Sequence, residues 1–284
     1  MHPRTTISHE LREWILATTR AGHGTAAVLQ LMKEHGYDPR QSRGIVAEVL
    51  KLPLATLLAG TTRGSLQGLR AKHPEAPEVR AGDRTIGVSL SVDAPVLRVL
   101  ENLLDENECD ELIALAQPRL QRALTVDSAG RQQVDRRRTS EGMFFTLDEV
   151  PPVGRIEQRL AALTGVPASH GEGLQILHYL PGQEYEPHFD WFDPEQPGYE
   201  AITAAGGQRI ASVVMYLNTP LRGGGTAFPE LGLTVTARRG AAVYFAYEGG
   251  DRSSLHAGLP VLEGEKWIAT KWLRERPYRK PTKA

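Results

Sequence analysis

Residues 174–190 read LQILHYLPGQEYEPHFD, and this stretch guides the interpretation of the whole sequence. It begins with a short run of β-forming residues, continues through a Pro-Gly turn and ends in a second extended run. His188 and Asp190 stand two positions apart in the second run. Side chains at positions i and i+2 of an extended chain leave on the same face, so this imidazole and this carboxylate can converge on one metal ion.

Short runs of the same kind recur along the chain, separated by Gly and Pro. They are Leu174–Tyr179, Ile210–Leu217, Leu233–Thr236, Ala242–Tyr247 and Trp267–Leu273, with an earlier strand around Val96–Leu100. Many short strands with turn residues between them are typical of an all-β sandwich or barrel rather than of alternating βαβ units. Two helices are expected in this region, one after the capping box Asp105/Glu108 and one over Arg155–Leu163.

The first part of the chain has a different pattern. Ser8, Thr25 and the pair Asp38-Pro39 are suited to begin three short helices with apolar stripes, which predicts a small helical bundle over residues 1–60. Residues 61–84 are rich in Gly and Pro and are interpreted as a linker. Residues 85–284 then form one mainly β domain.

The composition excludes several classes of protein. The 284 residues contain 33 Lys and Arg against 34 Asp and Glu, so no overall charge favours nucleic acid or an anionic membrane as a partner. No apolar run is long enough to span a membrane, and the first residues lack the apolar core of a secretory signal. The single cysteine, Cys109, excludes an intramolecular disulfide and a multi-cysteine zinc site. We therefore expect a cytoplasmic protein whose metal site, if present, uses His and carboxylates, and we expect Cys109 to be a buried apolar residue.

Two ligands are too few for tight metal binding, and His256 is the best candidate for a third. A His/Asp/His set on one face of a metal leaves open coordination positions, as in non-haem Fe(II) oxygenases. Taken alone, an H-x-D pair is more often structural than metal-binding. Lys266 strengthens the metal interpretation, because a lysine in an apolar strand is costly to bury unless an anion meets it. The alternative is that Lys266 reaches solvent from a sheet edge.

Several motifs in a fixed order resemble the prolyl 4-hydroxylase family of Fe(II)/2-oxoglutarate-dependent dioxygenases, over about residues 95–277. They are Gly173–Tyr179, Gly182–Asp190, Gln208-Arg209, Gly223–Thr226 before Phe228-Pro229, and His256–Trp272. The resemblance implies a double-stranded β-helix, or jelly roll, flanked by helices. It also implies hydroxylation of a prolyl residue in a peptide or protein with release of succinate and CO2. Fe(II), 2-oxoglutarate and O2 would be required, with ascorbate as a reductant.

The resemblance also implies roles for individual residues. His188, Asp190 and His256 would be the iron ligands, and Lys266, Tyr179 and Thr226 would hold 2-oxoglutarate. The substrate pocket would contain Arg209, Trp272, Arg138, Ser140, Tyr185 and Glu172. Arg274 stands where some relatives have His, and Gly225 stands where an acidic residue is common, which leaves the identity of the substrate open.

Other interpretations remain open at this stage. The substrate could be a free or carrier-bound amino acid, or the chain could be a noncatalytic 2-oxoglutarate- or oxygen-sensing binding module. A hydrolytic zinc site would leave Lys266, Tyr179 and Thr226 unexplained. The helical bundle could recruit a substrate protein, form a homodimer or cover a sheet edge. His178 precedes Tyr179 by one residue, so we expect it on the opposite face of the strand.

Overall fold

The computed structural model of the chain describes residues 7–20, 25–51, 74–122, 124–126, 132–134, 139–247 and 252–279. The chain divides into two compact units, Met1–Gln67 and Gly68–Ala284. None of the described helices is long and apolar enough to cross a membrane.

The first unit contains α1 (His9–Arg20), α2 (Thr25–Glu34) and α3 (Pro39–Leu50), in agreement with the expected helices. Ser8 Oγ accepts a hydrogen bond from the Leu11 amide, and Asp38 Oδ1 accepts one from the Gln41 amide, so the caps predicted at these two residues are formed. Thr25 is the first residue of α2. The helices share a small apolar core that includes Ile15. Trp14, beside Ile15 in α1, is 36% exposed.

The second unit is built on a nine-stranded antiparallel sheet with the strand order β1-β2-β3-β14-β10-β17-β8-β7-β4. The strands are β1 (Glu78–Ala81), β2 (Arg84–Asp93), β3 (Val96–Glu101), β4 (Gln121–Arg122), β7 (Glu141–Phe145), β8 (Leu174–Tyr179), β10 (Arg209–Tyr216), β14 (Ala242–Ala246) and β17 (Lys266–Arg274). The central strands β14, β10, β17 and β8 were all predicted from the sequence. They are buried on both faces, and they have the long apolar runs that such strands require.

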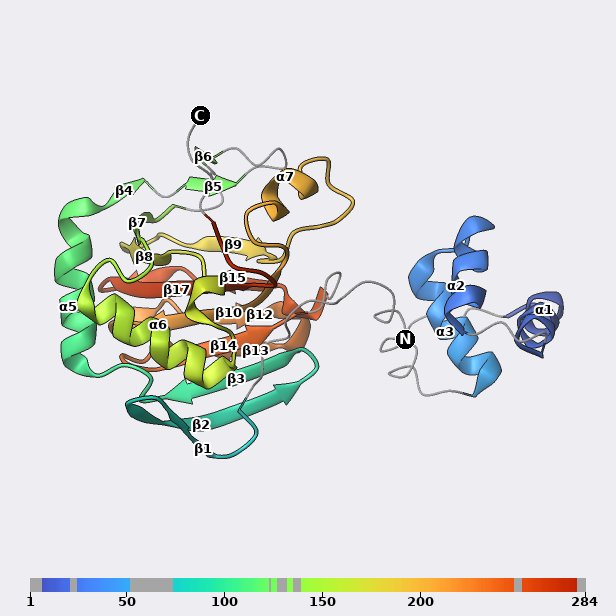
Figure 1. The fold of residues 1–284 in the computed structure, drawn as a ribbon, viewed down its shortest axis with the longest axis horizontal. Coiled ribbons are helices and arrows are strands. Elements are labelled where there is room, and N and C mark those ends of the chain that lie inside the picture. The colour runs from blue at the N-terminus through green and yellow to red at the C-terminus, as the bar shows by residue number, and fades with distance from the viewer. Residues whose placement is uncertain are drawn as a thin grey trace. The chain divides into compact units, whose positions relative to one another are not determined.

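Residues alternate between the two faces of this sheet along each central strand. In β10, Val213 and Met215 belong to one apolar core, while Val214 and Tyr216 belong to the other. The first core is covered by α5 (Glu106–Ala116) and α6 (Pro151–Thr164), which lie on that face of the sheet (Figure 1). The predicted capping box of Asp105 and Glu108 is present at the start of α5. Cys109 is fully buried in the same core, as expected.

The second core lies between the large sheet and a smaller one. The smaller sheet has the order β13-β12-β15-β9, formed by β9 (Tyr185–His188), β12 (Thr226–Phe228), β13 (Leu233–Val235) and β15 (His256–Gly258). Two further pairs are β5 (Leu124–Val126) with β6 (Gln132–Val134), and β11 (Arg222–Gly223) with β16 (Val261–Glu263). One short helix, α7 (Tyr199–Thr203), follows β9. The prediction of a mainly β fold with flanking helices is confirmed, and the sheets are antiparallel.

Part of the segment expected as a linker is regular structure. Residues 78–81 form β1, which pairs with β2 through Val79 opposite Ile86. Ala81 and Ile86 are fully buried in the first core, so burial stabilises this hairpin despite its Pro- and Gly-containing surroundings. Residues 61–73 of the expected linker, and residues 52–60 of the expected helical bundle, lie outside the described residues.

Candidate metal and cosubstrate site

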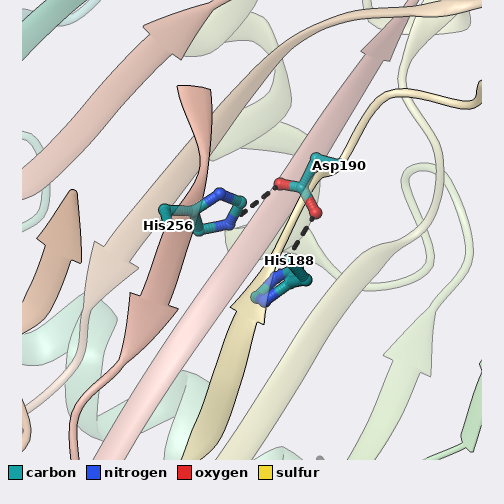
Figure 2. A group of neighbouring side chains, drawn as sticks. All are labelled: His188, Asp190 and His256. Carbon is teal, nitrogen blue, oxygen red and sulfur yellow. Dashed lines mark ion pairs between the residues drawn. The ribbon is translucent and has the colours of Figure 1, made fainter. Parts of the chain in front are cut away.

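The expected metal ligands converge at one point between the two sheets. His188 and His256 are register partners in the pairing of β9 with β15, and Asp190 follows two residues after the end of β9 (Figure 2). The Nε2 of His188 lies 3.8 Å from Asp190 Oδ1, and the Nε2 of His256 lies 3.5 Å from Asp190 Oδ2. Each of the three residues offers one ligand atom, and these three atoms all lie within 4.8 Å of one another.

Backbone carbonyls orient both imidazoles. His188 Nδ1 lies 2.8 Å from the Glu186 carbonyl oxygen, and His256 Nδ1 lies 3.1 Å from that of Ser254. Each Nδ1 therefore donates a proton to a carbonyl, which leaves Nε2 as the nitrogen that carries the lone pair. Both lone pairs are on the nitrogen that faces Asp190, as metal coordination requires.

Asp190 is ionised although it is 5% exposed. Burial raises the pKa of this carboxyl group, but electrostatic interactions with His256, His188 and Arg209, and a hydrogen bond from Ser212, lower it to about 2. Two imidazoles and one carboxylate on one side of a cavity match the donor set of a facial Fe(II) site, and the described residues add no fourth His, Cys or acidic ligand. The residues therefore fit the metal that the sequence predicted.

Lys266 is the second component of the site. It begins β17 directly opposite Tyr179 in β8, is 2% exposed, and lines the same cavity as the three ligands. Burial lowers the pKa of Lys266 to about 8. Within the described residues its ammonium group meets no carboxylate, and its contact is the ring of Tyr179, whose centroid lies 5.2 Å from Nζ. A buried cation of this kind is suited to an anionic ligand.

Thr226 lies on the same cavity, and its hydroxyl is already oriented. The Tyr216 hydroxyl donates to Thr226 Oγ1 at 2.8 Å, so the threonine proton is left for another acceptor. Gly224, just before Thr226, has φ of +69°, and a Cβ there would lie 3.3 Å from Lys266 Cδ. Glycine therefore allows this strand connection to pass close to the lysine. Lys266, Tyr179 and Thr226 are brought together as a group that can bind a carboxylate.

The expected substrate residues Glu172 and Arg209 pair with each other. Arg209 Nε and Nη2 donate to the two carboxylate oxygens of Glu172 at 2.6 and 2.9 Å, and Nη1 donates to the Asp190 carbonyl at 3.2 Å. The guanidinium group also stacks on Trp272, with Cζ 4.1 Å from the ring centroid. Arg274 adds a second cation, because its Nε lies 2.8 Å from Glu172 Oε1. Burial raises the pKa of Glu172, but the charges of Arg209 and Arg274 outweigh burial and lower it.

The remaining predicted substrate residues are placed differently. Tyr185 stacks on His188 with ring centroids 3.6 Å apart, and both Tyr185 and Trp272 line the cavity. The Nε1 of Trp272 and the Oγ of Ser140 are buried and have no hydrogen-bond partner among the residues that the structure describes. Arg138 lies outside the described residues. Trp272 therefore offers an unused donor to whatever enters the cavity.

Three hydroxyl residues near the site were not predicted from the sequence. Ser212 Oγ donates to Asp190 Oδ2 at 2.6 Å, Tyr247 contacts Ser212, and Tyr216 orients Thr226. The sequence contained a signal for two of them. Ser212 and Tyr216 lie an even number of positions apart in the predicted strand 210–217, so their hydroxyl groups lie on the same face of that strand. His178 is on the other face, as predicted, where it stacks on Trp267.

Comparison with known proteins agrees with this geometry. A family model described as the 2OG-Fe(II) oxygenase superfamily matches residues 174–274. Prolyl 4-hydroxylase 1 of Arabidopsis thaliana is 39% identical over 268 residues, covering 82% of this chain and 92% of the relative. Probable prolyl 4-hydroxylase 3 of the same plant is 39% identical over 205 residues, covering 64% of this chain and 70% of the relative.

Among solved structures, the viral collagen prolyl hydroxylase of Paramecium Bursaria Chlorella virus-1 in its 2OG complex is 28% identical. It covers 63% of this chain and 95% of its own, with a TM-score of 0.48. The matches to the two Arabidopsis relatives extend well beyond the metal ligands. Each match covers more than two thirds of the relative's own length. The chain is a member of the prolyl 4-hydroxylase family, within the 2OG-Fe(II) oxygenases.

Proposed function

We propose that the chain is an Fe(II)- and 2-oxoglutarate-dependent dioxygenase that hydroxylates a prolyl residue in a peptide or protein, with release of succinate and CO2. The observation that carries the proposal is one cavity that contains both the His188/Asp190/His256 group and the buried cation Lys266, which meets no carboxylate in the described part of the chain. The relatives named as prolyl 4-hydroxylases support the choice of a prolyl substrate.

Each residue group has a separate task in this proposal. His188, Asp190 and His256 would hold Fe(II), and the ammonium of Lys266 would bind the distal carboxylate of 2-oxoglutarate, with Tyr179 and the free proton of Thr226 beside it. Bound iron would supply the oxidising chemistry, with 2-oxoglutarate and O2 as cosubstrates and ascorbate as a reductant. The apolar lining of Leu177, Val214 and Ile268 would exclude water from the reacting groups.

The prolyl residue would lie near Trp272 and Tyr185, with Ser140 and Arg138 among the groups around it. The Trp272 indole offers an apolar face for a pyrrolidine ring, and its N–H, which has no partner within the described ranges, could donate to a substrate carbonyl. Arg209 has three of its five donors engaged by Glu172 and Asp190. We therefore assign the Glu172–Arg209 pair to holding Trp272 in place, with two N–H groups of Arg209 left for the substrate.

The direct test is turnover. Fe(II)-loaded protein with 2-oxoglutarate, ascorbate and proline-containing peptides should form succinate and add one oxygen atom to the peptide, measured by mass spectrometry. Oxygen added to a free or carrier-bound amino acid instead would reassign the substrate. Tight 2-oxoglutarate binding without any succinate would favour a noncatalytic sensing module.

The fold and domain assignment follow the same reasoning. We propose that the two antiparallel sheets facing each other across the second core form a jelly roll, and that residues 1–60 form a separate helical domain joined by a linker. Because β1 begins at Glu78, a truncation to test this should end near residue 67. Loss of activity on a protein but not on a short peptide would indicate substrate recruitment, and a change in oligomeric state would indicate dimerisation.

We also propose a cytoplasmic location, because a chain with the single cysteine Cys109 uses no intramolecular disulfide. Fractionation of the source cells tests this location.

A further inference from the structure

Asp190 has no strand pairing to hold it, since β9 ends at His188. Side chains from β10 hold it instead. Ser212 Oγ donates to Asp190 Oδ2 at 2.6 Å, and Arg209 Nη1 donates to the Asp190 carbonyl at 3.2 Å. The carboxylate and the backbone of this ligand are therefore held by two residues three positions apart on the neighbouring sheet.

The Ser212 hydroxyl is in turn contacted by Tyr247. The Tyr247 hydroxyl lies 3.2 Å from Ser212 Oγ, and Ser212, Asp190 and Tyr247 are 0%, 5% and 6% exposed. The three groups thus form a buried chain that ends on the predicted metal ligand.

The direction of the hydrogen bonds follows from the chemistry of the groups. A carboxylate that binds a metal has no proton to donate, so Ser212 must donate to Asp190. The serine has one proton, so its oxygen accepts from Tyr247. Burial and the neighbouring charge of Asp190 raise the pKa of Tyr247, which keeps this donor protonated.

The two oxygens of Asp190 therefore differ. Oδ2 lies 3.5 Å from His256 Nε2 and accepts the hydrogen bond from Ser212, whereas Oδ1 lies 3.8 Å from His188 Nε2 and accepts no hydrogen bond from the described residues. A carboxylate with one oxygen already engaged can rotate less and presents the other oxygen to a metal.

We propose that Ser212 and Tyr247 are positioning residues that fix the Asp190 carboxylate so that Oδ1 is presented to the metal, with Tyr247 acting through Ser212. The inference rests on the proposed function of the site. Neither residue is one of the three expected ligands or lines the cavity, so their effect should be seen in metal affinity.

The test measures Mn(II) affinity by electron paramagnetic resonance on the full-length, iron-free protein, without turnover. Ser212→Ala should weaken Mn(II) binding by about 10- to 100-fold, the range typical for the loss of a partner behind a metal ligand. Ser212→Thr, which retains a hydroxyl, should restore most of the affinity. Tyr247→Phe should weaken binding less than Ser212→Ala does.

A double variant tests whether the two residues act as one chain. If Tyr247 acts through Ser212, adding Tyr247→Phe to Ser212→Ala should cause no further loss of Mn(II) affinity. Independent, additive losses would overturn the proposal. Tyr244→Phe is the matched control, because Tyr244 is a fully buried tyrosine on β14 that faces the first core. It should leave Mn(II) affinity unchanged.

The outcomes separate this inference from the proposed function. If the unmodified protein binds no Mn(II), the metal site itself is wrong. If it binds Mn(II) and Ser212→Ala binds equally well, the metal site stands and the positioning role is wrong. A loss in Ser212→Ala that Ser212→Thr does not restore would also overturn the role of the hydroxyl.

Discussion

Lys266 and Tyr179 are directly opposite each other in the pairing of β17 with β8, and the ammonium nitrogen lies 5.2 Å from the centroid of the tyrosine ring. The pair faces the cavity that contains His188, Asp190 and His256. Lys266 is 2% exposed and meets no carboxylate within the described residues, so its charge is stabilised by little besides the aromatic ring. Its protonation should respond strongly to an anionic ligand.

Binding of 2-oxoglutarate should weaken as the pH rises above about 8, the pKa to which burial lowers Lys266 in the protein without ligand. A carboxylate beside the ammonium raises that pKa, so binding above pH 8 takes up a proton and affinity falls up to about tenfold per pH unit. Anaerobic calorimetry with Mn(II), in two buffers of different ionisation enthalpy, measures both the affinity and the proton uptake.

Lys266→Arg is the control for this pH dependence. Arginine stays charged throughout this range, so the 2-oxoglutarate affinity of the variant should be lower at pH 7 but flat between about pH 7 and 9.5. Equal pH dependence in both proteins would assign the effect to another group.

Linkage gives the same lysine an effect on folding stability. The pKa of Lys266 is about 8 in the folded protein and 10.5 in the reference state, so the unfolded chain binds more protons between these values. Deprotonation of Lys266 therefore raises the free energy of unfolding. This gain is complete above pH 10.5 and is lost as the pH falls to 8. Relative to Lys266→Met, the unmodified protein without ligand should therefore gain stability between pH 8 and 10.5, measured by urea unfolding.

Removing one metal ligand should abolish turnover and metal binding together. We expect His188→Ala, Asp190→Ala and His256→Ala each to weaken Mn(II) binding by more than about 100-fold, beyond the range for residues behind the ligands. His178→Ala is a matched control, because His178 stacks on Trp267 on the opposite face of the sheet. Retained turnover in any ligand variant would remove that residue from the metal site.

Tyr216→Phe should weaken 2-oxoglutarate binding without changing Mn(II) affinity. The Tyr216 hydroxyl donates to Thr226 Oγ1 at 2.8 Å and so leaves the threonine proton for the cosubstrate. Without that donor, the Thr226 hydroxyl can rotate, and a loss of about 1 kcal/mol, or roughly fivefold in affinity, is expected. Thr226→Val should show at least the same loss, and the two changes should not be additive. An unchanged 2-oxoglutarate affinity in Tyr216→Phe would show that Thr226 needs no partner.

The buried pair of Lys271 and Glu157 should govern stability rather than catalysis. Lys271 Nζ and Glu157 Oε1 are 2.5 Å apart, and the two residues are 1% and 3% exposed. Glu157→Gln leaves the lysine charge without a partner and should lower the free energy of unfolding by about 3–5 kcal/mol. Adding Lys271→Met should recover most of that loss, measured by urea unfolding.

An exposed ion pair provides the comparison for this prediction. Arg119 and Glu149 are 2.6 Å apart, with side chains that are 43% and 27% exposed. Arg119→Met should cost at most about 1 kcal/mol. If Glu157→Gln costs no more than that, the buried pair does not stabilise the contact between α6 and the sheet.

The most local features were predictable from the sequence. The central strand Leu174–Tyr179 was predicted to the residue, and the caps at Ser8, Asp38 and Asp105 are formed, because these features depend on the residue type and its immediate neighbours. Edge strands such as Glu78–Ala81 were missed, because burial against the first core stabilises them and their own composition does not.

The functional site also has some features that the sequence indicated and others that it did not. Sequence by itself indicated that His188 and Asp190 share a face, that His256 and Lys266 are candidates for the same site, and that a multi-cysteine site is excluded. It singled out Lys266 but did not show what either lysine of this strand, Lys266 or Lys271, contacts. Tertiary structure decided that, because Lys271 faces α6 and meets Glu157, while Lys266 faces the cavity and meets no carboxylate among the described residues. It also placed Ser212 and Tyr247 behind Asp190. Such contacts join residues far apart in the chain, so they depend on packing, which neighbouring residues in the sequence do not specify.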